Sequence, residues 1–330
     1  MASILYLGGT GVISRACVRR SLDLGHDVSI LTRGRSSLAG LEGVKTLVGD
    51  LRDPESVRAA IGSTSYDAVA QFVAFTPEHI TRDIDVFEGR TGQYVFISSA
   101  SAYEKPPKAL PITESTPLRN PFWQYSRDKI ACEDLLVAAF RDRGFPATIV
   151  RPSHTYDQTH IPTLGQGTDI ERMRSGRPVI VHGDGTTQWT LTHSDDVAVG
   201  IAGLLSNPLA IGEAFTITGT HAPTWNQIYR WLAEAAGAPD AELVHVSSQA
   251  IAAFAPDLAD GLLGDRSHSM VFDTAKITQL VPDFRTTITF DEGARRVVAW
   301  YDAHPHPGSP DSSTDAVFDR LVDYARSAGA

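Results

Sequence analysis

Cysteine is scarce in this chain of 330 residues, which contains only Cys17 and Cys132. Two cysteines cannot form a disulfide framework or a cysteine-rich metal site, and such scarcity is typical of a reducing compartment. His154, His182 and His193 are scattered rather than set at the fixed spacing of metal ligands. We therefore expect a cytoplasmic protein without a metal site.

Long apolar segments and excess positive charge are also missing. No apolar run approaches the length needed to cross a bilayer, and no basic stretch followed by an apolar one stands at the N-terminus. We expect no membrane partner and no signal peptide. The 29 Lys and Arg residues face 39 Asp and Glu residues, which gives a net charge of −10. This balance disfavours non-specific nucleic-acid binding, so no nucleic-acid partner is expected.

A glycine-rich turn follows the first apolar run of the chain. Residues 4–7 predict a buried strand, and residues 12–24 predict a helix. A strand, a glycine turn and a helix in this order are typical of a dinucleotide-binding fold, in which the turn and the helix N-terminus hold a pyrophosphate. The alternative is a glycine-rich turn between core elements without a ligand. The predicted cofactor residues of this turn are Gly8, Gly11, Val12 and Ile13.

The next two strands end in residues suited to an adenosine. The strand predicted at 27–32 is followed by Arg33 and Arg35, and guanidinium groups bind phosphate in a bidentate fork. This favours NADP over NAD, and the alternative is a solvated basic loop. The strand at 44–48 leads to Asp50 and Leu51, where Asp50 could accept from the adenine amino group. Its alternative role is to cap the helix at 54–61, although Asp53 suits that role better.

Strands and helices continue to alternate after this point. Further strands are predicted at 66–74, 94–97 and 146–150, with one short helix within 75–92. The alternation predicts an α/β fold, a Rossmann doubly wound parallel sheet covered on both faces. We expect a dinucleotide-binding domain over residues 1–150. A smaller C-terminal α/β substrate lobe over residues 151–330 would be interleaved with the core around residues 190–220.

Hydroxyl groups and an acid/base candidate follow the fifth strand. Ser99 and Ser101 come directly after it. In open parallel sheets, binding and catalytic residues lie at the carboxyl ends of the strands. A helix opening at Trp123 carries Tyr125 and Lys129, which lie four residues apart on one helix face.

These motifs occur in a familiar order along the chain. From residue 2 to residue 301 the chain resembles the extended short-chain dehydrogenase/reductases, the NAD-dependent epimerase/dehydratase family. The motifs that carry this resemblance are Gly8-x-x-Gly11, Ser99, Tyr125-x-x-x-Lys129, Arg151-Pro152 and Asp195-Asp196.

The resemblance implies a catalytic triad of Ser99, Tyr125 and Lys129. Tyr125 would be the general acid/base, Ser99 would bind the substrate oxygen, and Lys129 would hold the nicotinamide ribose. Lys129 and the positive nicotinamide would also lower the pKa of Tyr125 by favouring the phenolate. The alternative is a half-buried helix tyrosine beside a lysine that extends past it to solvent.

Departures from the family pattern reduce the range of reactions and substrates that the resemblance implies. Ala100 and Ser101 stand where members that eliminate water carry an Asp-Glu pair, so dehydration is disfavoured. Trp189 stands where nucleotide-sugar members tend to carry an arginine for the diphosphate, although Trp189 could equally be a core residue. Candidate substitutes for that arginine are Arg172, Arg174 and Arg177. Candidate substrate contacts are Ser101, His154 and Trp189.

Three functions remain open at this point. The first is an NAD(P)-dependent epimerase of a sugar or a nucleotide-linked sugar, and the second is an NADP(H)-dependent carbonyl reductase. The short 75–92 segment also resembles an atypical subgroup that includes chloroplast stem-loop RNA-binding proteins, so a non-catalytic binding protein is the third. In extended members the helix of this segment helps to build the dimer interface, so its shortening weakens the inference of the usual dimer. A homodimer stays possible. In the first two cases the partner is a small molecule with a hydroxyl or keto group.

Overall fold

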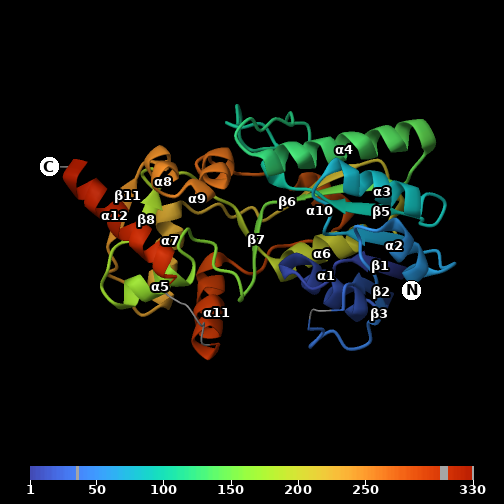
Figure 1. Cartoon of the computed structure of the whole chain (residues 1–330), viewed down its shortest axis with the longest axis horizontal. Helices are drawn as coiled ribbons and strands as arrows, with labels where there is room; N and C mark the ends of the chain where they lie inside the picture. Colours follow the sequence, from blue (N-terminus) through green and yellow to red (C-terminus); the bar gives the residue numbers. More distant parts are fainter. Residues whose placement is uncertain (35–36, 305–310, 329–330) are drawn as a thin grey trace.

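The computed structural model describes residues 1–34, 37–304 and 311–328, which form two lobes side by side (Figure 1). The first lobe contains a seven-stranded sheet in the order β10-β6-β5-β4-β1-β2-β3, with every pairing parallel. Its strands are β1 (Ser3–Leu7), β2 (Asp27–Thr32), β3 (Lys45–Val48), β4 (Ala68–Gln71), β5 (Tyr94–Ile97), β6 (Ala147–Pro152) and β10 (Ala214–Ile217). The prediction of a doubly wound parallel sheet is confirmed.

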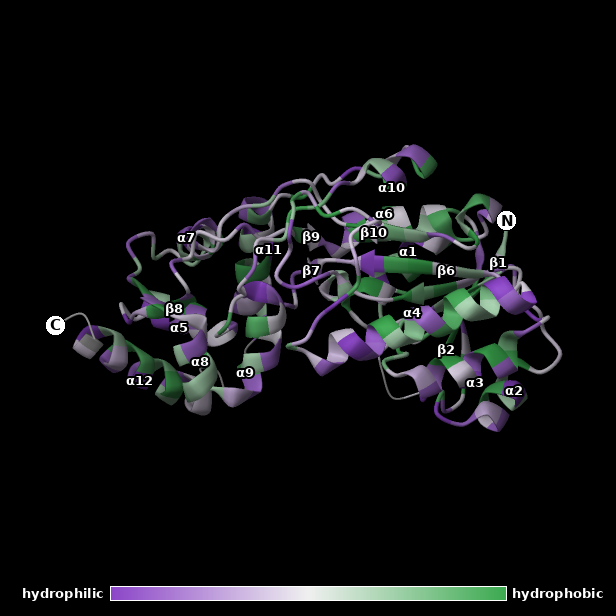
Figure 2. Cartoon of the chain, turned by 90° about the horizontal axis from the view of Figure 1, so that it is seen from above, coloured by the Kyte–Doolittle hydropathy of each residue, from purple (hydrophilic) through white to green (hydrophobic). Residues whose placement is uncertain are grey.

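Side chains alternate across this sheet, as the period of two in a strand requires. In β1, Ile4 and Tyr6 belong to one core cluster, and Leu5 and Leu7 belong to another. Both faces are covered by helices whose apolar sides face the sheet (Figure 2), which explains the continuous apolar run of β1. One face carries α1 (Val12–Asp23), α6 (Ser194–Leu204) and α10 (Ala275–Leu280), and the other carries α2 (Pro54–Ile61), α3 (Pro77–Phe87) and α4 (Gln124–Arg143).

The second lobe is smaller and more irregular. Its strands β8 (Val179–His182) and β11 (Leu243–Val246) pair in parallel, and its apolar core includes Trp225, Ile228 and Val297. Thr224 caps the amphipathic helix that follows it, because its Oγ accepts a hydrogen bond from Gln227 N at 3.2 Å. The helices of this lobe are α5 (Gly167–Arg174), α7 (Trp225–Ala235), α8 (Ser248–Phe254), α9 (Pro256–Gly261), α11 (Phe290–Ala303) and α12 (Ser312–Ala328).

The chain crosses between the lobes more than once. After β6, the short parallel strands β7 (His154–Tyr156) and β9 (Leu191–His193) pair at the junction. The chain then returns through α6 to β10, at the edge of the large sheet beside β6. Asp196 at the start of α6 accepts from the backbone N–H groups of Thr287 and Ile288, both at 3.0 Å, and so ties a later crossing segment to this helix.

Several predicted boundaries differ from the structure by one to a few residues. The strand predicted at 66–74 is shorter, because residues after Gln71 bend away along the mouth of the sheet. The terminal helix α12 begins at Ser312, because the Asp311 carboxylate accepts a hydrogen bond from the N–H of Ser313 at 3.2 Å and caps the first turn. None of the described helices is long and apolar enough to cross a membrane.

Candidate active site

The glycines of the turn after β1 have two different roles: some adopt backbone angles that favour glycine, and one leaves space beside the turn. Gly8 and Gly9 have φ values of +100° and +112°, a region that favours glycine, and a Cβ on Gly9 would lie 2.9 Å from Ile30 Cγ2. Gly11 has an ordinary φ of −83°, and a Cβ there would meet only Ser14 Oγ, at 3.5 Å. Gly11 therefore leaves room in a groove that runs past this turn, whereas Gly8 and Gly9 shape the turn itself. The sequence reasoning missed Gly9.

The N-terminus of α1 faces the same groove. This helix has no acidic residue in its first turn and no side-chain cap, so its positive end is free for an anion. Ser14 in the first turn of the helix is 3% exposed, and its Oγ accepts a hydrogen bond from Gly11 N at 3.0 Å. Val12 and Ile13 line the groove together with Gly11. The open glycine turn and the uncapped helix fit the pyrophosphate of a dinucleotide.

A second cavity, of about 400 Å³, continues from Gly8 along the ends of β2 and β3. Arg33, Asp50 and Leu51 all line it, as expected for an adenosine pocket. The Arg52 guanidinium, 2.6 Å from Asp50, holds the pKa of that carboxyl well below its usual range. Asp53 caps α2 instead, with Oδ1 3.0 Å from Glu55 N, which leaves Asp50 for the pocket. The sequence reasoning missed Arg52, and Arg35 lies outside the described residues.

Lys129 is fixed beneath the groove. The side chain is 2% exposed, and its Nζ donates to the carbonyl oxygens of Ala74 at 2.8 Å and Ile97 at 2.7 Å. Burial lowers the pKa of Lys129 to about 8. Because an ammonium has three N–H groups, one remains for a hydroxyl in the groove.

Tyr125 and Ser99 lie next to each other beside this lysine. Burial raises the pKa of the Tyr125 phenol, and its hydrogen bond with Ser99 acts in the opposite direction. Burial therefore outweighs any lowering in the protein alone, and the expected lowering by Lys129 together with the nicotinamide stays a prediction. Lys129 Nζ lies 5.7 Å from the centroid of the tyrosine ring and is directed to two carbonyl groups instead.

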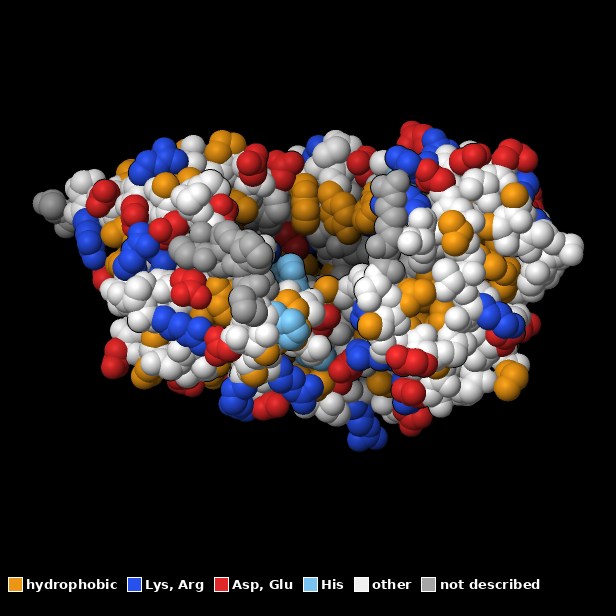
Figure 3. Space-filling view, turned by 60° about the horizontal axis from the view of Figure 1, so that its bottom comes forward, with side chains coloured by type: hydrophobic (Ala, Val, Ile, Leu, Met, Phe, Trp, Pro, Cys, Tyr) orange, Lys and Arg blue, Asp and Glu red, His pale blue; other side chains and the backbone are white. Residues whose placement is uncertain are grey.

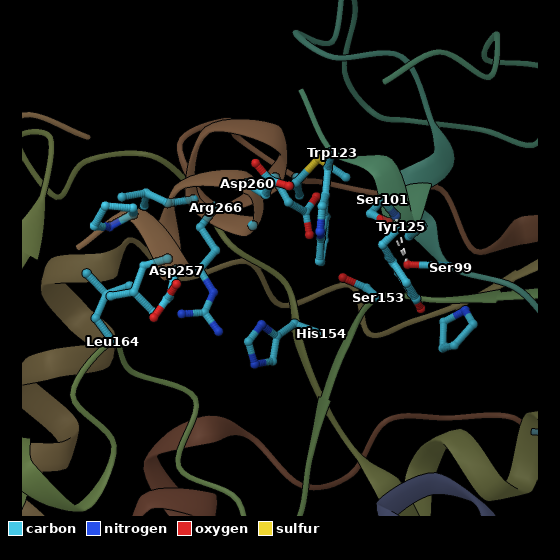
Figure 4. Close-up of a pocket in the computed structure, with 18 residues that line it drawn as sticks. Ser99, Ser101, Trp123, Tyr125, Ser153, His154, Leu164, Asp257, Asp260 and Arg266 are labelled. Carbon is cyan, nitrogen blue, oxygen red and sulfur yellow. Dashed lines mark hydrogen bonds between the residues drawn. The ribbon is translucent and has the colours of Figure 1, made fainter. Parts of the chain in front are cut away.

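Hydrogen bonds join the two serines to the start of α4. Ser99 Oγ lies 2.9 Å from Ser101 Oγ and 3.1 Å from Ser101 N, as the dashed lines of Figure 4 show. Ser126 Oγ on α4 donates to Ser101 Oγ at 2.8 Å. The Asn120 side-chain amide also reaches Ser101 O at 2.9 Å and Gly264 O at 2.7 Å. Asn120 thus connects the serine segment to the second lobe.

A buried ion pair supports the end of β5 from below. Glu133 on α4 is 2% exposed and accepts from Arg151 on β6, with Arg151 Nε 3.0 Å from Glu133 Oε1. Glu133 also accepts from Ser98, and Arg151 donates to the Tyr103 hydroxyl at 3.1 Å. The network joins β5, β6 and α4 directly beneath Ser99.

Two cavities meet at the predicted catalytic residues. One, of about 460 Å³, is lined by the glycine turn, Ser99, Tyr125 and Lys129. The other, of about 670 Å³, extends into the second lobe from Ser99 and Tyr125 to His154. Figure 3 shows the surface hollowed between the lobes, and Figure 4 shows the larger cavity from inside.

Not every predicted substrate residue reaches this larger cavity. Ser101 and His154 line it, and burial holds the pKa of His154 well below its usual value. Trp189 does not line it: the side chain is 1% exposed and packs against Trp225, with ring centroids 5.3 Å apart. The prediction of a substrate contact at Trp189 is therefore wrong, and its alternative as a core residue is correct.

The proposed substitutes for a phosphate-binding arginine are also wrong. Arg172 and Arg177 pair with Asp315 at 2.6 and 2.8 Å, and Arg174 pairs with Asp302 at 2.7 Å. All three arginines hold helices of the second lobe together. The sequence reasoning missed the lining residues Trp123, Asp265 and Arg266. Trp123 lies two residues before the predicted catalytic motif, whereas the segment of Asp265 and Arg266 carries no recognisable motif. Among the described residues, no group of His, Cys, Asp and Glu could hold a metal ion.

Comparison with known proteins identifies the family to which this architecture belongs. Residues 4–218 match the model of the NAD dependent epimerase/dehydratase family. The chain belongs to this family. It is an enzyme family of NAD(P)-dependent epimerases and reductases, which agrees with the paired cavities at the ends of the strands.

Individual relatives differ in what their names say they do. The chain is 27% identical over 286 residues to 2'-dehydrokanamycin reductase of Streptomyces kanamyceticus, covering 86% of this chain and 80% of that protein. It is 28% identical to a chloroplast stem-loop binding protein of 41 kDa of Arabidopsis thaliana, over 73% of this chain and 65% of that protein. The UDP-glucose 4-epimerase of Bifidobacterium longum, solved with NAD+ and UDP, has a TM-score of 0.72 and 21% identity, over 92% of this chain and 98% of that one. This last likeness shows the fold alone.

Proposed function

We propose that this family member is an NAD(P)-dependent epimerase that oxidises a secondary hydroxyl of a sugar and returns the hydride to the opposite face. The observation that carries the proposal is the meeting of the two cavities at Ser99 and Tyr125. A dinucleotide in the groove and a substrate in the larger cavity would meet at these two side chains.

The chain's own residues supply proton transfer and positioning. The nicotinamide, when bound, supplies hydride exchange with the substrate carbon. Tyr125 accepts the hydroxyl proton during oxidation and gives it back during reduction. Ser99 donates a hydrogen bond to the substrate oxygen and stabilises the negative charge that develops there. Lys129 holds the nicotinamide ribose with its third N–H, and its positive charge favours the tyrosine phenolate.

A second candidate function is net carbonyl reduction with NADPH. Arg33 lines the adenosine pocket, where a guanidinium suits a 2'-phosphate, and the 27% identical relative is a reductase. An epimerase retains its cofactor and shows no net change in nicotinamide absorbance during turnover. A reductase consumes NADPH in stoichiometric amounts, so absorbance with a panel of sugars and keto sugars distinguishes the two. Binding without any turnover would support the non-catalytic alternative.

The decisive variant for either reaction is Tyr125→Phe, which removes one hydroxyl and keeps the ring. Turnover should fall by roughly 100-fold or more, the usual size of a general acid/base contribution. Cofactor affinity, measured by fluorescence titration, should change little. Tyr324→Phe on the surface of α12 is the matched control and should keep full activity. Full activity of Tyr125→Phe on the true substrate would exclude the mechanism.

A further inference from the structure

One arginine in the wall of the larger cavity has no partner among the residues that the structure describes. Arg266 ends η3 (Leu262–Arg266), a single wide turn in which Ser267 N bonds to Leu262 O at 2.9 Å. Within residues 1–34, 37–304 and 311–328, its guanidinium makes neither an ion pair nor a hydrogen bond. Figure 4 shows this group projecting between Asp257 and His154.

The backbone of the same residue is firmly held. The carbonyl oxygen of Arg266 accepts from His182 Nε2 at 3.0 Å and from Trp225 Nε1 at 3.2 Å. Both partners belong to the core of the second lobe and are 1% exposed or less. A fixed backbone with an unpaired head group is the arrangement expected of a ligand-binding side chain, because the position is set before the ligand arrives.

Leaving this guanidinium unpaired is energetically unfavourable. Burial lowers the pKa of Arg266, which means that its surroundings disfavour the charge. A guanidinium has five N–H donors, and partly buried donors without acceptors destabilise a fold. Arg172, Arg174 and Arg177 in the same lobe all have carboxylate partners. Arg266 is the exception that lines a cavity, so its missing acceptor would come from a ligand.

We propose that Arg266 binds a single anionic group of the substrate, a carboxylate or a phosphate monoester, at the end of the cavity opposite Tyr125. The proposal rests on the proposed function only for the statement that this group belongs to the reacting molecule. The substrate would then be an anionic sugar or polyol derivative, whose single anionic group one arginine is enough to bind.

The remaining charges of the cavity limit the ligand to one such group. Asp257, Asp260 and Asp265 also line it, and Asp265 pairs with Lys105 at 3.3 Å. The other two carboxylates stand exposed on α9 at the rim. A second negative charge would lie near these carboxylates, and the described lining of the cavity contains no other Lys or Arg to pair with it. A nucleoside diphosphate is therefore disfavoured.

Calorimetric titration of the NADP-saturated full chain with inorganic phosphate tests the proposal. Saturation with NADP occupies the groove at the glycine turn, which would otherwise bind phosphate itself. We expect millimolar binding by the wild type and at least tenfold weaker binding by Arg266→Met. Arg266→Lys should be intermediate because it keeps charge without the bidentate fork. The exposed Arg326→Met is the control and should bind as the wild type does.

Two further probes fix the class of the anion. Glucuronate binding that depends on Arg266 indicates a carboxylate, and phosphate binding alone indicates a phosphate monoester. Pyrophosphate should bind no more than tenfold tighter than phosphate, and a larger gain would overturn the restriction to one anionic group. Equal affinities in wild type and Arg266→Met, or no binding of phosphate and glucuronate at all, would overturn the proposal. Repeating the titration on Tyr125→Phe separates it from the proposed chemistry, since anion binding should survive there.

Discussion

The two sides of the active site differ in how completely the protein satisfies its own polar groups. On the cofactor side, Lys129 bonds to two carbonyl groups, and Glu133 and Arg151 satisfy each other beneath the serines. On the substrate side, the guanidinium of Arg266 has no ion-pair or hydrogen-bond partner among the described residues. The first side is built before any ligand binds, whereas the second lacks acceptors that a ligand could supply.

The largest expected effect on stability comes from breaking the buried ion pair on the cofactor side. Arg151→Met leaves the Glu133 carboxylate buried without a cation, and breaking a buried pair in this way typically costs about 3–5 kcal/mol. The free energy of unfolding, measured with urea, should fall by that amount. Arg143→Met is the control, because its pair with Glu88 is exposed and 3.4 Å long, and such pairs contribute about 0–1 kcal/mol. Equal losses in the two variants would contradict the view that this network is a structural support.

A smaller effect is expected at the outer end of the groove. Arg33→Ala should weaken NADP binding roughly tenfold, or about 1.5 kcal/mol, because one charge-assisted contact with the 2'-phosphate is lost. NAD affinity should stay nearly constant, since NAD has no such phosphate. Fluorescence titration with both cofactors measures the difference. An equal loss for NAD and NADP would show that Arg33 does not read the phosphate.

The same contrast explains which features the sequence could predict. The strand at 94–97 matches β5, and the helix at 54–61 matches α2, because apolar periodicity and a capping Asp53 leave little choice there. The placement of Gly11, Arg33, Tyr125 and Lys129 along one groove followed from strand ends that share one edge.

The substrate side could not be predicted in the same way. The segment that bears Arg266 carries no periodic pattern, and its position depends on contacts with Asn120, His182 and Trp225, which are distant in sequence. Trp189 was ambiguous for a related reason: a tryptophan near strand ends can face either a cavity or a core, and only the packing of Trp225 decides. The division at residue 150, the cytoplasmic location and the oligomeric state stay predictions.

The smallest expected change in stability concerns Arg266 on the substrate side. If the unpaired guanidinium of Arg266 contributes nothing to the fold without a ligand, Arg266→Met should change the free energy of unfolding by less than about 1 kcal/mol, in either direction. Removal of a disfavoured charge offsets the loss of packing along the side-chain stem. Urea denaturation of the ligand-free protein measures this, beside Arg151→Met under the same conditions. A loss of about 3 kcal/mol or more, close to that of Arg151→Met, would mean that Arg266 already has a structural partner, and the contrast between the two sides would fail.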